Sequence, residues 1–81
     1  MAHVELTPSL CARFTDGVPS VEVDAATVLQ LVQALERLFP GIGEHIEARV
    51  SVAIDGMVIR DWTTAIAPQA RIFLIPRIAG G

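Results

Sequence analysis

One amphipathic helix between two stretches of strand-like alternation constrains the fold of this chain more than any other feature. We expect Asp24 to cap the helix and Pro40-Gly41 to end it, since proline disfavours a helical residue before it. Between them, apolar residues recur at helical spacing: Val28, Leu31, Val32, Leu35, Leu38 and Phe39. A single helix cannot bury such a stripe alone, so it must lie across a sheet built from the rest of the chain.

Alternation of polar and apolar residues before the helix predicts two strands. The first begins at His3, is interrupted by Pro8, which cannot donate to a strand ladder, and resumes over residues 10–14. Thr15-Asp16-Gly17 is a turn signal, and residues 18–23 alternate again. A glycine-containing turn between two strands predicts antiparallel pairing.

After the helix, residues 41–48 predict a polar connection with at most one helical turn. Residues 49–54 alternate, Asp55-Gly56 predicts a tight hairpin turn, residues 57–60 return, and residues 71–75 form the last strand. The order predicts an α+β, mixed sheet of about four or five strands around one main helix, which is the order of the β-grasp, or ubiquitin-like, fold. Its expected core includes Val21, Val23, Val32, Leu35, Val52, Ile54 and Leu74.

The composition excludes several classes of protein. Apolar residues make up 52% of the chain and charged residues 19%, whereas disorder requires low hydrophobicity and high charge. Cys11 is the single cysteine, so a disulfide framework is excluded, and His3 and His45 do not complete a zinc site. We find neither an apolar run of membrane-spanning length nor a signal peptide, so we expect a cytoplasmic protein without a membrane partner.

The charge argues against nucleic acid as a partner, because the net charge is −3 and phosphate binding requires a basic surface. The charge is also uneven. Residues 1–47 carry seven acids against two Arg, and residues 48–81 carry four Arg against two acids. The basic half has the charge needed to bind an acidic protein surface. The alternative is that its arginines only contact solvent.

The residues that usually carry out catalysis form no recognisable motif in this chain. Nothing resembles a nucleophile elbow or a phosphate-binding loop. Cys11 is expected to pack inertly in a strand, His3 and His45 to be exposed, and Trp62 to cover an edge of the core. The sequence therefore predicts a protein that is not an enzyme.

The last strand is apolar on both faces. Ile72 and Leu74 point to one face and are expected to enter the core. Phe73 and Ile75 point to the other face and stand between two arginines. An apolar patch with a charged rim is typical of a protein-binding surface, although Phe73 could instead cover an edge of the core.

The chain continues beyond residues 1–76, the expected domain, as a tail over residues 77–81 that we expect to be flexible. Four or five extended residues reach about 13–17 Å. Because Gly80 and Gly81 lack a Cβ, their backbone is narrow enough to enter a tight channel. A glycine carboxylate at the end is an unhindered acyl group; the alternative is a frayed terminus.

The segment Ile75-Pro76-Arg77-Ile78-Ala79-Gly80-Gly81 resembles the tail of the sulfur-carrier proteins related to the molybdopterin synthase small subunit and the thiazole-forming sulfur carrier (MoaD and ThiS). The resemblance covers nearly the whole chain, and its tail is the specific part. It implies that a ubiquitin-activating-type adenylyltransferase uses ATP to adenylylate the terminal glycine. A sulfur donor, a cysteine desulfurase or rhodanese-like protein, then supplies sulfur, and the resulting thiocarboxylate passes it to a biosynthetic enzyme.

The resemblance also implies a role for individual residues. Gly81 is the sulfur acceptor, and Val58 joins Phe73 and Ile75 in the surface that docks on partners. The protein itself would be a carrier, such as the small non-catalytic subunit of molybdopterin synthase, with no bound cofactor and no metal. The rest of the tail is Arg77, Ile78, Ala79 and the spacer Gly80.

Three positions depart from the family pattern. Arg77 stands where many members have a second proline, Pro68-Gln69-Ala70 replaces a polar Asp-Gly-Asp turn, and Asp55 replaces the hairpin asparagine. These changes leave the activation chemistry intact and bear on the pathway that receives the sulfur. Length and overall pattern favour molybdopterin synthesis, with the large subunit of the synthase as the downstream partner.

The sequence also leaves open other pathways that could receive the sulfur, namely those that make thiazole, cysteine, thiolated tRNA and thiocarboxylate siderophores. A different class of alternative is a ubiquitin-like modifier joined to lysines of target proteins through Gly81. A third is a ubiquitin-like interaction module that uses Phe73 and Ile75 and carries no sulfur.

Overall fold

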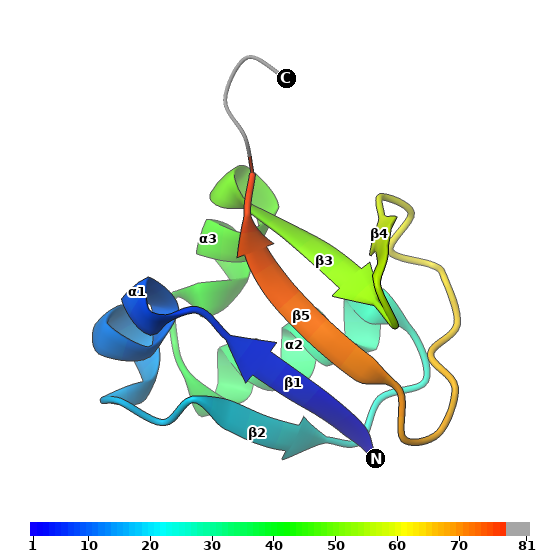
Figure 1. The fold of residues 1–81 in the computed structure, drawn as a ribbon, viewed down its shortest axis with the longest axis horizontal. Helices are drawn as coiled ribbons and strands as arrows, with labels where there is room; N and C mark the ends of the chain where they lie inside the picture. The colour runs from blue at the N-terminus through cyan, green and yellow to red at the C-terminus, as the bar shows by residue number, and fades with distance from the viewer. Residues whose placement is uncertain (78–81) are drawn as a thin grey trace.

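The computed structural model describes residues 1–77 and consists of one mixed sheet with its helices packed on one face (Figure 1). The strand order is β2-β1-β5-β3-β4, so the last strand lies in the centre. It pairs parallel with β1 and antiparallel with β3. The strands are β1 (Ala2–Leu6), β2 (Ser20–Val23), β3 (Val50–Ile54), β4 (Met57–Ile59) and β5 (Arg71–Pro76); the helices are α1 (Pro8–Leu10), the π-helical turn η1 (Cys11–Thr15), α2 (Val28–Leu38) and α3 (Ile42–Arg49).

The core lies between the sheet and helices α2 and α3. Most of the predicted core is confirmed, because Val23, Val32, Leu35, Val52 and Leu74 are buried. The other two predicted residues, Val21 and Ile54, are half-buried and pack against this core.

The predicted helical stripe was wrong at one position, Leu38, which is 55% exposed. Leu38 is the last residue of α2. The next residue, Phe39, has left the helical conformation and packs against the core. The stripe therefore loses Leu38 but keeps its last predicted residue, Phe39.

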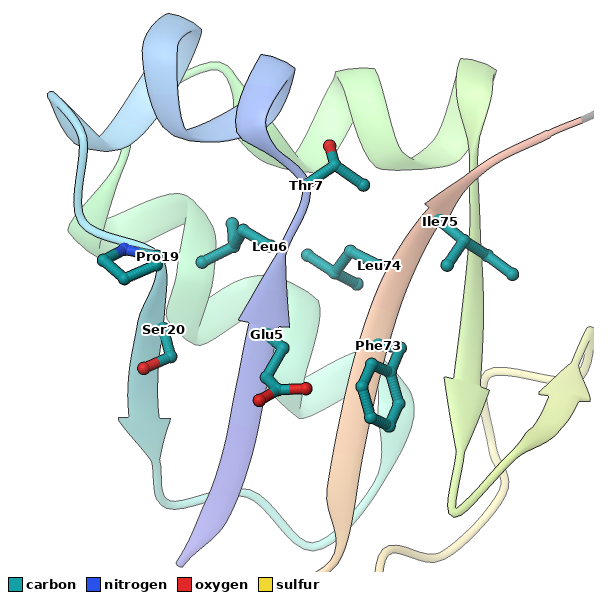
Figure 2. A pocket seen from close by; sticks show the side chains of 8 residues that line it. All are labelled: Glu5, Leu6, Thr7, Pro19, Ser20, Phe73, Leu74 and Ile75. Atoms are coloured by element: carbon teal, nitrogen blue, oxygen red, sulfur yellow. The ribbon is translucent and has the colours of Figure 1, made fainter.

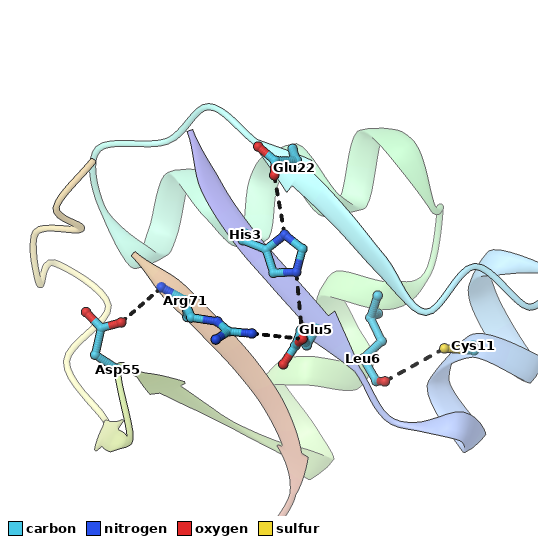
Figure 3. Close-up of polar contacts among 7 residues, drawn as sticks. All are labelled: His3, Glu5, Leu6, Cys11, Glu22, Asp55 and Arg71. Atoms are coloured by element: carbon cyan, nitrogen blue, oxygen red, sulfur yellow. Dashed lines mark hydrogen bonds and ion pairs between the residues drawn. The ribbon is translucent and has the colours of Figure 1, made fainter. Parts of the chain in front are cut away.

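The predicted strand over residues 10–14 is wrong, because this segment is helical. Thr7 caps α1, its Oγ1 accepting a hydrogen bond from the backbone N–H of Leu10 at 3.3 Å. Pro8 occupies the first turn, where its missing N–H costs nothing, so it starts a helix rather than interrupting a strand. Cys11, expected in a strand, begins η1 and is buried, with its thiol 3.8 Å from the carbonyl oxygen of Leu6 (Figure 3).

The antiparallel pairing of the first two strands is confirmed, although they are joined through α1 and η1 instead of a tight hairpin. Helix α2 begins later than predicted, because Thr27, and not Asp24, is its N-cap. Thr27 Oγ1 accepts from Gln30 N at 3.2 Å, and the Gln30 side chain accepts in return from Ala26 N at 2.9 Å. This exchange satisfies two backbone donors at the helix start.

Residues 41–48, predicted as a polar connection, instead lie mostly in helix α3, which extends to Arg49 and buries Ile42 and Ile46. The carboxylate of Glu36 in α2 holds the start of α3 by accepting from Gly41 N at 2.9 Å and from Gly43 N at 2.8 Å. These two backbone donors favour the ionised form and lower the pKa of Glu36. Gly41 has a φ of 98°, a left-handed conformation that glycine adopts without strain.

The predicted hairpin at Asp55-Gly56 is confirmed, with φ values of 48° and 89° at its two central residues. Asp55 also ties the turn to the start of β5. Its N–H donates to Arg71 O at 2.9 Å, and its Oδ1 accepts from Arg71 N at 3.0 Å (Figure 3). An aspartate at this position therefore fixes the register of β3 against the last strand.

Three single-residue expectations can be compared with the structure. Trp62 packs half-buried against the core, as predicted. His3 and His45 are half-buried rather than exposed, because His3 lies between two carboxylates and the ring of His45 packs on Phe14 with centroids 5.3 Å apart. Across residues 1–77 we find no helix with the length and hydropathy of a membrane span.

We predict that Glu36→Gln lowers the stability of the protein in a pH-dependent way. The pKa of Glu36 is lowered in the folded state, so its contribution is complete above the ordinary carboxyl pKa of 4.5 and is lost as the pH falls through the folded-state pKa. Urea denaturation should therefore show a larger loss of unfolding free energy at about pH 7 than at about pH 3.

Glu47→Gln serves as the matched control, because Glu47 is exposed on α3 and its side chain makes no hydrogen bond within residues 1–77. It removes the same charge and should show a smaller effect at both pH values. An equal loss for Glu36→Gln at both pH values would contradict the proposed role of its charge.

Candidate functional site

Strand β5 divides its side chains between the core and an open face of the sheet. Leu74 is 1% exposed and points toward the helices. Phe73 is half-buried and Ile75 is 37% exposed, both on the face that no described helix covers (Figure 1). The predicted separation of the two faces of this strand is therefore confirmed.

The register of the sheet brings two of the predicted interface residues into one row. Phe73 pairs with Ala53 of β3, and Ala53 pairs with Val58 of β4. Val58 is 49% exposed, whereas Ala53 between its two larger neighbours is only 5% exposed. Of the two roles that the sequence left open for Phe73, the structure favours the apolar patch, because Phe73 is not among the half-buried side chains that pack against the core. We call Val58, Ala53, Phe73 and Ile75 the outer-face patch.

A shallow groove of about 380 Å³ adjoins this patch on the side of β1 and β2. Figure 2 shows the side chains of Phe73 and Ile75 projecting from β5 beside Glu5 of β1. Pro19 and Ser20 form the far wall. The lining of the groove is mostly apolar, with the polar side chains Glu5, Thr7 and Ser20 among it.

A chain of polar and charged side chains lies on the same face, toward the start of β5 (Figure 3). Arg71 Nη2 is 3.4 Å from Glu5 Oε1, and His3 lies 3.7 Å from Glu5 and 3.3 Å from Glu22. Exposed pairs of this kind contribute about 0–1 kcal/mol each, so they define a polar border rather than hold the fold.

The root of the tail is held by the end of α3 and the start of β3. Arg77 N donates to Arg49 O at 2.9 Å, and Arg77 Nη2 donates to Val50 O at 3.2 Å. Of the predicted tail residues, only Arg77 is among those the structure describes. Ile78, Ala79, Gly80 and Gly81 lie outside the described residues, so the acceptor role of Gly81 remains a prediction.

Within residues 1–77 no three metal-binding side chains come together. Cys11, the one thiol of the chain, is buried beneath the first strand and does not line the groove.

Sequence reasoning missed Ala53, Glu5 and Ser20, which belong to the same face. A signal for Ala53 was present, because a two-residue turn at Asp55-Gly56 fixes Ala53 opposite Val58. No comparable signal existed for Glu5 and Ser20, since their places depend on long-range pairing with β5 and across β1.

Comparison with solved structures places the fold. The BexX/CysO complex of Amycolatopsis orientalis contains a chain 23% identical to this one, with a TM-score of 0.85 and complete coverage of both chains. SAMP1 of Haloferax volcanii is 22% identical, with a TM-score of 0.77 over 99% of this chain and 98% of its own. A chain in the complex of subunits 1 and 2 of the molybdopterin-converting factor of Helicobacter pylori is 18% identical, with a TM-score of 0.68 over 99% and 97%.

These likenesses confirm the predicted class: the chain is a β-grasp, ubiquitin-like protein. Its sequence matches the ThiS family over residues 11–81, which is most of its length. The chain therefore belongs to the ThiS family, in agreement with the resemblance drawn from its tail. A comparison with curated protein sequences finds no match.

We predict that adjacent residues of β5 differ sharply in their contribution to stability. Leu74→Ala leaves a cavity in the core and should cost about 2–5 kcal/mol. Ile75→Ala removes a side chain from the open face and should cost about 1 kcal/mol or less. Urea denaturation of the two variants measures the difference. Equal losses would contradict the assignment of Ile75 to a surface available for binding.

Proposed function

We propose that this chain is a sulfur carrier whose terminal glycine, Gly81, is adenylylated and then converted to a thiocarboxylate. The observation that carries the proposal is the match to the ThiS family, which extends through residue 81. The geometry of the described residues supports it, because β5 runs through the outer-face patch and leads directly to the tail. A protein docked on the patch is thus close to the chain that leads to Gly81.

The chemistry needs no catalytic residue from the carrier. A carboxylate is a poor acyl donor, so its oxygen attacks the α-phosphorus of ATP and pyrophosphate leaves. The resulting acyl adenylate has AMP as a good leaving group. Sulfide then attacks the acyl carbon and AMP departs; a protein persulfide instead gives an acyl disulfide, from which a second thiol releases the thiocarboxylate by forming a disulfide with the donor cysteine. The thiocarboxylate product is ionised and nucleophilic at neutral pH, as thiolates are.

The proposal implies three kinds of protein partner. A ubiquitin-activating-type adenylyltransferase supplies the ATP chemistry, and a cysteine desulfurase or rhodanese-like protein supplies the sulfur. A biosynthetic enzyme receives it. In this account the chain itself is a carrier and not an enzyme, and it holds no cofactor of its own. Its location in the cytoplasm remains a prediction.

The identity of the receiving enzyme is a finer part of the proposal. Length and overall pattern favour a molybdopterin synthase large subunit. The higher TM-score of the BexX/CysO complex, 0.85 against 0.68 for the molybdopterin-converting factor, makes a CysO-like role the second candidate. Offering the thiocarboxylated protein to both kinds of enzyme and following loss of its sulfur distinguishes the two.

A modifier role is the alternative from a different class, and the similarity to SAMP1 makes it worth a direct test. Conjugation through Gly81 would produce species of higher molecular weight in cells, visible on a blot against this protein. A thiocarboxylate without such species supports the carrier.

We predict that ATP, the cognate activating enzyme and a sulfide source increase the intact mass of the protein. The gain should equal one sulfur atom in place of one oxygen atom and should map to the last peptide. Gly80→Val and Gly81→Ala should impair the reaction, because each adds side-chain bulk where a narrow backbone is required. Extra residues after Gly81 should abolish it unless they are removed. An unchanged mass of the wild type beside a demonstrably cognate enzyme would contradict the proposal.

We further predict that a charge within the outer-face patch weakens docking on the activating enzyme. Val58→Glu and Phe73→Glu should each raise the Kd about tenfold or more, because they place an unpaired charge in a desolvated contact. Leu29→Glu is the matched control, since Leu29 is an exposed apolar residue of α2, outside the sheet. Titration calorimetry measures the three affinities, and equal effects at all three positions would contradict the choice of this face.

A further inference from the structure

A second depression, of about 250 Å³, lies beside the root of the tail and is lined by basic and hydroxyl side chains together with the apolar residues Leu10, Val50 and Pro76. His45 and Arg49 come from α3, Arg77 follows β5, and Thr7 and Ser9 come from the start of α1. None of its lining residues is acidic. We call this depression the basic pocket.

Two arginines are held next to each other in this pocket by the backbone. Arg77 N donates to Arg49 O at 2.9 Å, which continues the pairing of β5 with β3 by one residue. Within residues 1–77 neither guanidinium has a carboxylate partner. Both side chains line the depression, so they leave its lining with positive charge.

Hydrogen-bond donors in the pocket remain available for an anion. Arg77 Nη2 donates to Val50 O at 3.2 Å, and a guanidinium has four further N–H groups. Thr7 Oγ1 acts as an acceptor toward Leu10 N, which leaves its own hydrogen free to donate. The position of Arg49 in the last turn of α3 complements the helix dipole, and Arg77 uses one N–H to hold the root of the tail, so Arg77 keeps further donors beyond its structural role.

We propose that the basic pocket binds an acidic segment of the activating enzyme, and this inference rests on the proposed function. The four residues after Arg77 reach about 13 Å when extended, so an enzyme that holds Gly81 must face the surface from which the tail departs. Charge complementarity then requires carboxylates opposite Arg49 and Arg77. The pocket sets the orientation of the carrier, while the outer-face patch supplies apolar contact.

The test measures binding of the full chain to the cognate activating enzyme, without ATP or a sulfur source, at low and high salt. Arg49→Glu should weaken binding about tenfold at low salt and less at high salt, because it reverses a charge at the contact. Arg49→Gln should show a smaller loss in the same direction. Arg37→Glu is the matched control, since Arg37 is an exposed arginine at the end of α2, and it should change the Kd less than about twofold. Circular dichroism checks that each variant is folded.

Three results would overturn the inference. One is an equal effect of Arg49→Glu and Arg37→Glu, and another is the absence of measurable binding by the wild type. The third is a saturable shift of the His45 signals on titration of the free protein with inorganic phosphate, which would assign a small-anion site instead. Because the assay needs no sulfur, a wild type that binds but gains no sulfur contradicts the carrier function alone.

Discussion

The pairing of β5 between β1 and β3 is the interaction on which the rest of the structure depends. Strand β5 connects the two halves of the sheet, because it pairs parallel with β1 on one side and antiparallel with β3 on the other. It buries Ile72 and Leu74 against the helices, exposes Ile75 on the other face, and ends at the root of the tail. The part of the chain that completes the core is therefore also the part that a partner meets.

Local patterns predicted the fold well where a single interaction decides the structure. The spacing of Val28, Val32 and Leu35 predicted α2, and Asp55-Gly56 predicted the β3–β4 turn, because helix periodicity and turn geometry are set by neighbouring residues. The errors lie in short helical segments. Helix α3 depends on the core that buries Ile42 and Ile46 and on the Glu36 carboxylate of α2, which holds its start. The start of α1 is set locally, by the Thr7 cap and by Pro8 in the first turn, a helix-start signal that was misread as the interruption of a strand.

The candidate site was predictable in part for the same reason. The place of Phe73 and Ile75 in the site was predicted from alternation within one strand, whereas that of Val58 was predicted only from the resemblance to the family. The groove beside Glu5 and the adjacency of Arg49 and Arg77 could not be predicted, because both arise from pairing between strands far apart in the chain. The uneven charge of the sequence indicated a basic region without locating it.

Hydrogen exchange of the full chain, alone and bound to the activating enzyme, tests most directly whether the sheet face and the root of the tail form one docking surface. The account predicts new protection in β4, in β5 and at the end of α3, around Val58, Ile75 and Arg49, and little change along the exposed side of α2. Protection concentrated on α2, with β4 and the end of α3 unchanged, would contradict it.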